Sequence, residues 1–395
     1  MTRWGKMVAV LAAALAITVT TAVPATAGPA RPGPWDFLGG SAVAWGDNSY
    51  AQLGDGTDQS RFASRPVAGL DRGVKQVSGG RVHSLAVTTD GRVLWWAWSL
   101  WGPPSMTPVP LNPLGGIVQA EAGGRHNLAL GANGTVWSWG QNTSGQLGDG
   151  GQVDRPRTPA QVPGLTGIVQ VAAGDTHSLA LRNDGTVWAW GENSAGQLGD
   201  GTTTDRYLPV RVAGLTGVTR IAGGDRHSLA IIALGEVAAW GSNGSGQLGI
   251  GSFTVGSQSP VPVTVTNLWQ VVDISGGGGH SMAVKSDGTV WNWGLNVNKQ
   301  LGAIPHMWAW GLPTRATDPG MRFRRVAAGM YHSLALAADG SVWTWGTVHG
   351  DTFQDLPTRR VWEYPVRLPD VHDATDIAAG DVHSLAVWSR PPVNG

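Results

Sequence analysis

The 395-residue sequence contains no cysteine, and only 14% of its residues are charged. The absence of cysteine excludes disulfides and cysteine-ligated metal sites. Lysine and arginine (27) balance aspartate and glutamate (27), whereas binding to nucleic acid requires clustered positive charge. The sequence also lacks the G-x-S-x-G, H-E-x-x-H and P-loop patterns. We therefore predict no enzymatic activity, no cofactor, no metal site and no nucleic-acid partner.

Long apolar runs are also scarce, and the one that is present lies at the N-terminus. Arg3 and Lys6 precede an apolar run over residues 7–16, and Ala25-Thr26-Ala27 provides an A-x-A cleavage site. This order predicts a secretory signal peptide over residues 1–27, with a retained N-terminal anchor helix as the alternative. The run is short for a transmembrane span. We therefore expect a secreted, extracellular protein with no membrane span after processing.

Glycine (59 residues) and tryptophan (21 residues) are abundant instead, and they recur in a repeat. The copy at residues 171–201 contains V-A-A-G-D-T-H-S-L-A-L, D-G-T-V-W-A-W-G and G-Q-L-G-D-G. An anchor histidine recurs at intervals of 43 to 53 residues: His83, His126, His177, His227, His280, His332 and His383. A Trp-Gly pair recurs with it: Trp45, Trp139, Trp190, Trp240, Trp293 and Trp345. The second copy has Trp96 at this position, so we count seven structural units.

Each copy has the alternation of a β-hairpin. H-S-L-A-L and V-W-A-W alternate as half-buried strands do, and an Asp-Gly or Asn-Gly pair such as Asp184-Gly185 separates them. Such a pair predicts a two-residue turn with positive φ at both central positions. The G-Q-L-G turn and a short extended segment such as residues 208–212 follow. Four short strands in about 50 residues are typical of a propeller blade.

The ends of the repeat array predict how the ring closes. The first copy has only the Trp-Gly half, at Trp45, and the last has only the histidine half, over residues 376–387. We predict that the N- and C-terminal strands pair in one shared blade, which removes exposed sheet edges. The expected fold is all-β: a seven-bladed β-propeller of four-stranded antiparallel blades over residues 41–388, after a Pro/Gly-rich linker (28–40) and before a tail (389–395).

The strings G-x-H-S-L-A-L, D-G-x-V-W-x-W-G and N-x-x-G-Q-L-G-D-G resemble the regulator-of-chromosome-condensation repeat family. The resemblance covers residues 41–388 and implies a seven-bladed β-propeller, here as an exported bacterial member. Members include a nuclear exchange factor for a small GTPase, tubulin-related and ubiquitin-ligase modules, and exported bacterial β-lactamase inhibitors, which implies protein binding through one ring face. The exchange factor acts through a protruding insertion and has basic extensions. Here no interval between anchor histidines exceeds 53 residues, so we expect no such insertion.

The repeated polar and aromatic residues each have two interpretations. We interpret the histidines as structural, each bonded to a backbone carbonyl within its own blade; a metal-binding ring is the alternative. Adjacent His and Ser residues point to opposite faces of a strand, so we expect no nucleophilic dyad. Trp188 and Trp190 indicate core filling, with sugar stacking as the alternative. Asp55, Asp149 and Asp200 indicate tight turns, with calcium binding as the alternative.

Three copies depart from the template and carry aromatic residues where the Gly-Asp-Gly turn is lost. These are copies two, six and seven, and in a seven-membered ring copies six, seven, one and two are consecutive. Irregular aromatic loops in one sector indicate a binding surface; the alternative is repeat decay, with aromatic residues refilling vacated space. We call the candidate binding residues the aromatic arc: Trp98, Trp101, Tyr50, Phe62, His306, Trp308, Trp310, Phe353, Trp362 and Tyr364.

The leading functional hypothesis is a non-enzymatic exported propeller that docks an extracellular or cell-wall protein through one face, with inhibition of that protein as one form of docking. A carbohydrate- or cell-wall-binding propeller, with a glycan as ligand, is the second hypothesis. A guanine-nucleotide exchange factor, by analogy with the family, is the third and requires residence in the cytosol. The sequence does not identify the protein partner.

Overall fold

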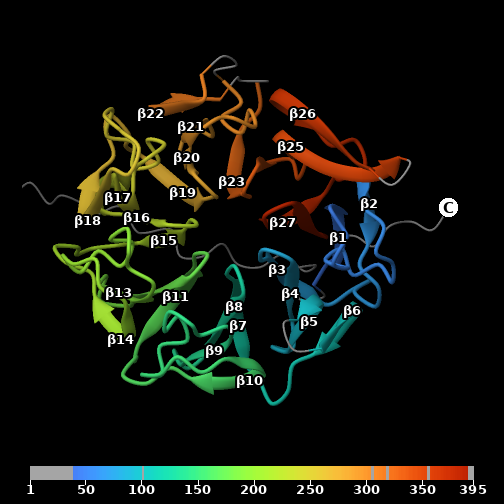
Figure 1. The fold of residues 1–395 in the computed structure, drawn as a ribbon. Helices are drawn as coiled ribbons and strands as arrows, with labels where there is room; N and C mark the ends of the chain where they lie inside the picture. The colour runs from blue at the N-terminus through green and yellow to red at the C-terminus, as the bar shows by residue number, and fades with distance from the viewer. Residues whose placement is uncertain (1–38, 100–101, 304–306, 317–319, 354–355, 390–395) are drawn as a thin grey trace, which may run out of the picture.

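Seven four-stranded antiparallel sheets are arranged in a ring (Figure 1), and a channel lies at its centre. The computed structural model describes residues 39–99, 102–303, 307–316, 320–353 and 356–389. In each sheet an inner strand lines the channel, the second strand begins at the anchor histidine, the third ends near the Trp-Gly position, and an outer strand forms the rim. This arrangement confirms the predicted seven-bladed β-propeller.

We number the blades along the ring, starting from the blade that both chain ends share, and give the strands of each from the channel outward. Blade 1 contains β27 (Ala374–Ala379), β28 (His383–Trp388), β1 (Ser41–Gly46) and β2 (Arg61–Pro66). Blade 2 contains β3 (Val74–Gly79), β4 (His83–Thr88), β5 (Val93–Ser99) and β6 (Gly102–Pro110). Blade 3 contains β7 (Ile117–Ala122), β8 (His126–Gly131), β9 (Val136–Gly140) and β10 (Arg155–Gln161). Blade 4 contains β11 (Ile168–Ala173), β12 (His177–Arg182), β13 (Val187–Gly191) and β14 (Arg206–Arg211).

The remaining three blades follow the same order. Blade 5 contains β15 (Arg220–Gly223), β16 (His227–Ile231), β17 (Val237–Ser242) and β18 (Gln258–Thr264), with the short 3-10 helix η1 (Ala233–Gly235) between β16 and β17. Blade 6 contains β19 (Val271–Gly276), β20 (His280–Lys285), β21 (Val290–Leu295) and β22 (Ala309–Arg315). Blade 7 contains β23 (Phe323–Ala328), β24 (His332–Ala337), β25 (Val342–Phe353) and β26 (Leu356–Arg367).

Several sequence-based boundaries fall at the edge of the described chain. The predicted signal peptide, most of the predicted linker and residues 390–395 of the predicted tail lie outside the described residues. No helix of the described chain is long and apolar enough to span a membrane.

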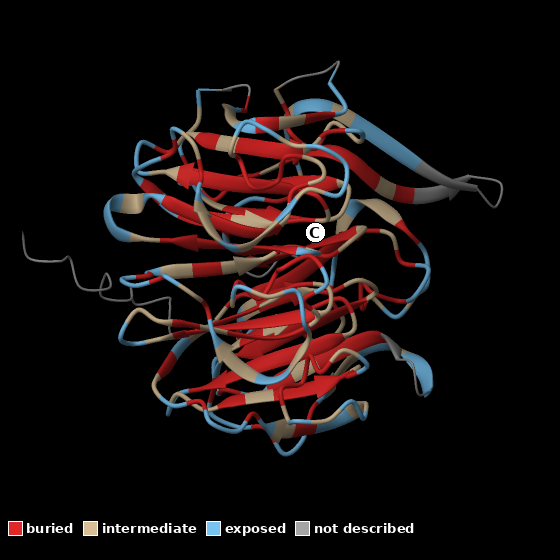
Figure 2. Cartoon of the chain, turned by 60° about the vertical axis from the view of Figure 1, so that its left-hand side comes forward, coloured by how far each residue is buried: buried red, intermediate tan, exposed pale blue. Residues whose placement is uncertain are grey.

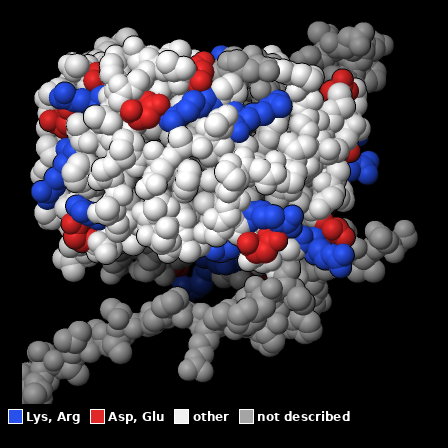
Figure 3. All heavy atoms as spheres, turned by 90° about the horizontal axis from the view of Figure 1, so that it is seen from below, with Lys and Arg blue, Asp and Glu red and all other residues white. Residues whose placement is uncertain are grey.

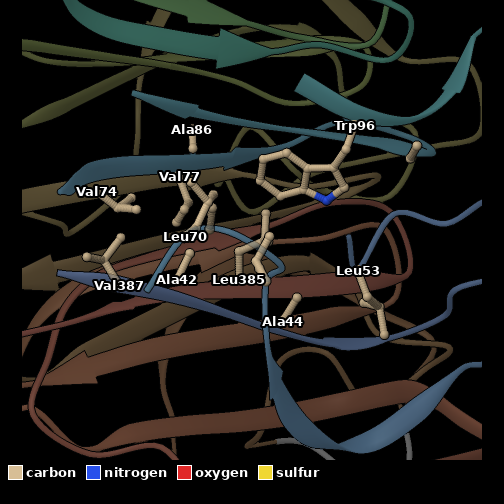
Figure 4. Close-up of a cluster of buried hydrophobic side chains, with 13 residues drawn as sticks. Ala42, Ala44, Leu53, Leu70, Val74, Val77, Ala86, Trp96, Leu385 and Val387 are labelled. Carbon is tan, nitrogen blue, oxygen red and sulfur yellow. The ribbon is translucent and has the colours of Figure 1, made fainter. Parts of the chain in front are cut away.

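The two ends of the chain complete blade 1, as predicted. Strand β1 pairs antiparallel with β28, and Trp45 lies opposite Ser384. Apolar side chains of these strands, such as Ala42 and Leu385, pack against Trp96 of blade 2 (Figure 4). The composite blade is therefore joined to its neighbour by an ordinary apolar core.

The apolar core is divided into seven clusters, one between each pair of neighbouring blades. Each cluster contains one fully buried tryptophan: Trp45, Trp96, Trp139, Trp190, Trp240, Trp293 or Trp345. Trp190 Nε1 donates a hydrogen bond to the carbonyl of Gln146 in the preceding blade. Trp45 Nε1 has no partner among the described residues, because copy seven lacks the G-Q-L-G turn that supplies this carbonyl elsewhere.

The anchor histidines connect neighbouring blades. His126 Nε2 lies 2.9 Å from Ser178 Oγ of the next blade, and His83 bonds to Asn127 in the same way. Ser178 Oγ donates its hydrogen to the carbonyl of Gln146, so Nε2 carries the imidazole proton. The predicted bond to a carbonyl within one blade is wrong, because the imidazole points across the gap between blades. The other pairs are His177–Ser228, His227–Ser281, His280–Ser333, His332–Ser384 and His383–Ser84.

The Asp-Gly turns differ from the prediction in one torsion angle. Of the pair Asp184-Gly185, only the glycine has a positive φ, of 77°. The Arg182 N–H donates to the carbonyl of Thr186, so the loop has three residues instead of two. Asp184 Oδ1 accepts hydrogen bonds from the N–H and the hydroxyl of Thr186. The prediction of positive φ at both positions is wrong because the aspartate caps the turn with its side chain.

The strand directions place the connections on two opposite faces of the disc. The loop face carries the loops between third and outer strands, such as residues 192–205, and the loops that precede the anchor histidines. The turn face carries the Asp-Gly turns and the connections from each outer strand to the next blade. Figure 3 shows charged side chains along the two edges of the rim and a largely uncharged band between them.

Blade 7 carries a hairpin that projects beyond the loop face (Figure 2). Its strands β25 and β26 each span 12 residues, against five for β13. His349 pairs with Arg359, at a level where blade 4 has already turned into its glycine-rich loop. Copy seven contains no insertion, as the spacing of the histidines predicts, but a hairpin protrudes from it, which was not expected. Copy seven has the usual length, but the residues that replace the lost turn extend both strands. We call β25 and β26 beyond Gly346 the projecting hairpin.

Candidate protein-binding face

The structure separates exposed from partly buried members of the aromatic arc. Tyr50 and Trp308 lie on the loop face with 48% and 52% of their surface exposed, and Tyr364 is exposed on β26. Phe62, Trp310 and Trp362 are partly buried. Trp101 and His306 lie outside the described residues, as do the side chains of Trp98 in β5 and Phe353 in β25.

Phe62 and Trp362 both lie where the projecting hairpin crosses blade 1. Phe62 lies against Gly350 of the hairpin, and the guanidinium of Arg360 lies 4.3 Å from the centre of the Phe62 ring. Phe62 and Trp362 both pack against the apolar cluster between blades 7 and 1. At these two positions the aromatic rings fill space between blades and hold the hairpin against the ring.

A second aromatic group lies over blades 5 and 6 on the loop face. Trp308 packs edge-on against Phe253, with 5.7 Å between the ring centres. Val255 of the same loop is 92% exposed, and Val297 and Met307 are exposed as well. We call these five residues the apolar platform. Sequence reasoning missed Phe253 and Val255 because copy five keeps its G-Q-L-G turn and the extra apolar residues follow it.

The aspartates of the Gly-Asp-Gly turns bind arginines of the outer strands. Asp200 lies 2.7 Å from Arg206, and Asn193 Nδ2 donates to its other oxygen at 3.2 Å. The equivalent ion pairs are Asp55–Arg61 and Asp149–Arg155. These carboxylates therefore fasten the loops to the rim. Within the described chain, no group of three or more histidine or acidic residues is arranged to hold a metal ion.

A channel of about 490 Å³ runs through the centre of the ring, and polar side chains encircle its wall. The Gln119 side chain donates to the carbonyl of Val171 in the next blade and accepts from the N–H of the same residue. Gln76 and Gln170 make the same pair of bonds to their neighbours. From blade 5 onward, ion pairs take this place: Arg220–Asp273 and Arg325–Asp376.

Carboxylates and one arginine surround the channel mouth on the loop face. Arg81 reaches past Gly124 to form ion pairs with Asp381 at 3.2 Å and Asp175 at 3.1 Å. Burial raises the pKa of Asp225 to about 7 and the pKa of Asp381 to about 6, and neighbouring carboxylates add to both shifts. Above pH 7 the mouth therefore carries more negative than positive charge.

The cross-blade His–Ser pairs have the residue types of a base and a nucleophile. His177 and Ser228 are fully buried and 2.9 Å apart. Burial lowers the pKa of His177 to about 3, so its imidazole is a weak base at neutral pH. The Ser228 hydroxyl donates to the carbonyl of Gln197. Sequence reasoning considered only neighbours within one strand and missed these pairs, which form between blades.

Comparison with known proteins assigns the ring to a family. The RCC1-like domain matches residues 99–391, and the regulator of chromosome condensation (RCC1) repeat matches residues 40–87. The chain belongs to the RCC1-like family. Human HERC6, a probable E3 ubiquitin-protein ligase, is 33% identical to this RCC1-like chain over 330 residues, which are 80% of this chain and 27% of HERC6. The chain thus spans about a quarter of the length of that relative.

Two solved structures share the RCC1-like ring. Human WBSCR16 has a TM-score of 0.75 and 22% identity, covering 89% of this chain and 99% of the human chain. Prp20p from Saccharomyces cerevisiae has a TM-score of 0.75 and 24% identity, covering 89% of this chain and 93% of the yeast chain. Prp20p has binding properties to Gsp1p and histones. At these identities the comparison establishes the shared fold.

Proposed function

We propose that this RCC1-like chain is a non-enzymatic protein-binding propeller whose loop face docks a partner protein. The apolar platform carries the proposal, because Trp308 and Val255 remain exposed on loops that depart from the repeat. Exposed aromatic and apolar residues that lie together are typical of protein-binding surfaces. The acidic channel mouth and the projecting hairpin lie on the same face, so one partner that covers this face would contact all three features.

The proposed partner is an extracellular or cell-wall protein, because the signal peptide expected over residues 1–27 directs the chain out of the cell. Docking of this kind includes inhibition of the partner. The proposal of no enzymatic activity is supported by the complete burial of the His–Ser pairs such as His177 and Ser228. A substrate cannot reach a serine hydroxyl that is buried between two blades.

Two other functions predict different outcomes. A carbohydrate-binding propeller uses Trp308 to stack against a sugar ring, and it retains polysaccharide from the cell wall with no stoichiometric protein. An exchange factor accelerates nucleotide release from a small GTPase in the cytosol. Both remain alternatives that the experiment below separates from docking of a protein.

The test compares two tryptophans of equal exposure on opposite faces. Trp308 is 52% exposed on the loop face, and Trp269 is 51% exposed on the turn face. The chain from residue 28 onward is immobilised and used to capture proteins from the culture medium of the organism that makes it. We expect one stoichiometric protein, with Trp308→Ala weakening its binding by about tenfold or more and Trp269→Ala by less than about twofold. Equal loss in both variants, or capture of polysaccharide alone, contradicts the proposal.

A further inference from the structure

Every outer strand has one edge without a neighbouring strand, and prolines interrupt most of these edges. Proline has no N–H and cannot donate to an added strand. In β26, Pro357 and Pro365 enclose seven residues, from Thr358 to Tyr364. In β2 the free run has five residues, and there the Ser64 N–H already bonds to Asp370. In the other five outer strands prolines leave shorter runs: Pro103, Pro104, Pro108 and Pro110 in β6, Pro156 and Pro159 in β10, Pro209 in β14, Pro260 and Pro262 in β18, and Pro313 in β22.

The uninterrupted edge of β26 faces away from the ring. Strand β25 lies between β26 and β2 (Figure 1), and β26 pairs with β25 alone. Within the described chain, no backbone hydrogen bond joins residues 358–364 to any other strand. In an antiparallel strand, alternate N–H and C=O groups point outward. This stretch therefore presents main-chain donors and acceptors to an incoming strand on its side away from β25.

The side chains of β26 are apolar and basic. Among residues 359–367 the exposed ones are Arg359, Arg360, Val361, Tyr364, Val366 and Arg367, together with the strand's one acidic residue, Glu363. Glu363 lies 3.7 Å from Lys299 and is thereby neutralised. The Arg360 guanidinium lies over the Phe62 ring, and in the described chain none of the three arginines forms an ion pair. Arg367 lies near enough to Asp339 to lower the pKa of that carboxyl. With three arginines against Glu363 and Asp339, the edge has an excess of positive charge.

We propose that β26 binds an extended, acidic segment of the partner protein as a fifth strand of blade 7. This inference rests on the proposed protein-binding function and names the chemistry of the segment. Main-chain hydrogen bonds hold an added strand whatever its sequence. Acidic side chains of the segment pair with Arg359 and Arg367 on one face of the strand, and its apolar side chains contact Tyr364 on the other face. A second copy of this chain is disfavoured because two β26 edges repel each other.

The experiment uses a synthetic peptide of about ten residues, the length of a long strand, that alternates glutamate with valine. A peptide with lysine in place of glutamate is its control. With the chain from residue 28 onward, we expect the glutamate peptide to bind at least about tenfold more tightly at low salt. Hydrogen exchange should slow at amides of residues 358–364, and at alternate positions only, because the other amides already face β25.

Charge reversal on β26 tests the role of the arginines. We expect the double variant R359E/R367E to lose about tenfold or more in affinity for the glutamate peptide. The matched control is Arg211→Glu, because Arg211 lies opposite Trp188 in blade 4 as Arg367 lies opposite Trp343 in blade 7. Its affinity should change by less than about twofold.

The outcomes separate this inference from the proposed function. Peptide binding without slowed exchange in β26 overturns strand addition, and equal binding of the lysine peptide overturns the choice of an acidic segment. Slowed exchange in β26 that depends on protein concentration alone identifies a second copy as the occupant and also overturns it. Binding of a single-stranded oligonucleotide in place of the peptide also overturns the proposal of an acidic protein segment. Failure of platform docking is read from the capture experiment with Trp308→Ala, whereas failure of strand addition is read from the peptide and from amide exchange in β26.

Discussion

Each anchor histidine is neutral in the folded ring because it is buried between two blades. Burial lowers the pKa of His177 to about 3 and the pKa of His227 to about 4. The Nε2–H of His177 donates to Ser228, and the Ser228 hydroxyl donates to the Gln197 carbonyl. The His177 ring lies against Gly174, where a Cβ atom would collide with it. These hydrogen bonds require a neutral His177 imidazole with its proton on Nε2. They also require glycine at position 174, where the ring packs.

Replacing Ser228 by alanine tests this chain of bonds. The variant removes the acceptor of the His177 Nε2–H, whereas the Gln197 carbonyl keeps its bond from Trp240. A buried donor without a partner costs about 1–3 kcal/mol, so the free energy of unfolding in urea at pH 7 should fall by that amount. Ser252→Ala, at an exposed serine, should change it by less than about 0.5 kcal/mol. Equal effects of the two variants would show that the His–Ser bond does not stabilise the ring.

At the scale of elements, the projecting hairpin takes the place that a glycine-rich loop has in other blades. Gly145 in the loop of blade 3 lies against Tyr207 of blade 4, and Gly350 in the hairpin of blade 7 lies against Phe62 of blade 1. Tyr207 and Phe62 are each the second residue of their outer strand. The contact between one blade and the next outer strand is therefore kept although strands replace the loop.

Phe62→Ala is expected to loosen the projecting hairpin while the ring stays folded. The variant removes the aromatic ring against which the Arg360 guanidinium lies. Because Phe62 is only partly buried, the free energy that holds the hairpin against blade 1 should fall by about 1–3 kcal/mol. Amide exchange should accelerate in β26 and β2 and stay unchanged in blade 4. Tyr207→Ala makes the equivalent truncation in blade 4. Faster exchange of β26 in that variant would contradict a local role of Phe62.

The elements also show what the sequence could and could not predict. The alternation in H-S-L-A-L and V-W-A-W predicts the second and third strands, because one register buries each apolar set, and the blades confirm it. The projecting hairpin could not be predicted, since copy seven has the usual length and residues 347–364 suit a loop as well as two strands. The apolar platform was missed because the contact of Phe253 with Trp308 joins two blades, and no sequence pattern within either copy indicates it.

At the scale of the whole molecule, closing the ring buries seven histidines at once and makes stability depend on pH. In the unfolded chain a histidine has a pKa near 6.5, whereas in the ring the pKa of six of them is about 3 or 4. Below pH 6.5 these histidines therefore bind more protons in the unfolded chain than in the folded chain, and their contribution lowers the free energy of unfolding as the pH falls. The six are His126, His177, His227, His280, His332 and His383.

Asp225 at the channel mouth has the opposite dependence. Burial and the carboxylates of Asp381 and Asp175 raise its pKa from 3.8 to about 7. Between these two values the folded chain holds a proton that the unfolded chain has lost. The destabilising effect of the charged carboxylate is therefore present above pH 7 and is relieved as the pH falls towards 4.

Asp225→Asn separates this carboxylate from the histidines, which titrate identically in both proteins and cancel in the difference. We expect the variant to raise the free energy of unfolding by about 1–2 kcal/mol at pH 8, a range reduced for the partial exposure of Asp225, and by less than about half as much at pH 5, where the unfolded carboxyl is still ionised. Denaturant unfolding at both values measures this. Asp184→Asn is the control: hydrogen bonds from Thr186 lower the pKa of Asp184, so its loss of stability should be the same at pH 5 and pH 8. If Asp225→Asn changed the free energy of unfolding by the same amount at pH 5 and pH 8, the charged Asp225 carboxylate would not destabilise the channel mouth. The raised pKa of Asp225 would then be wrong.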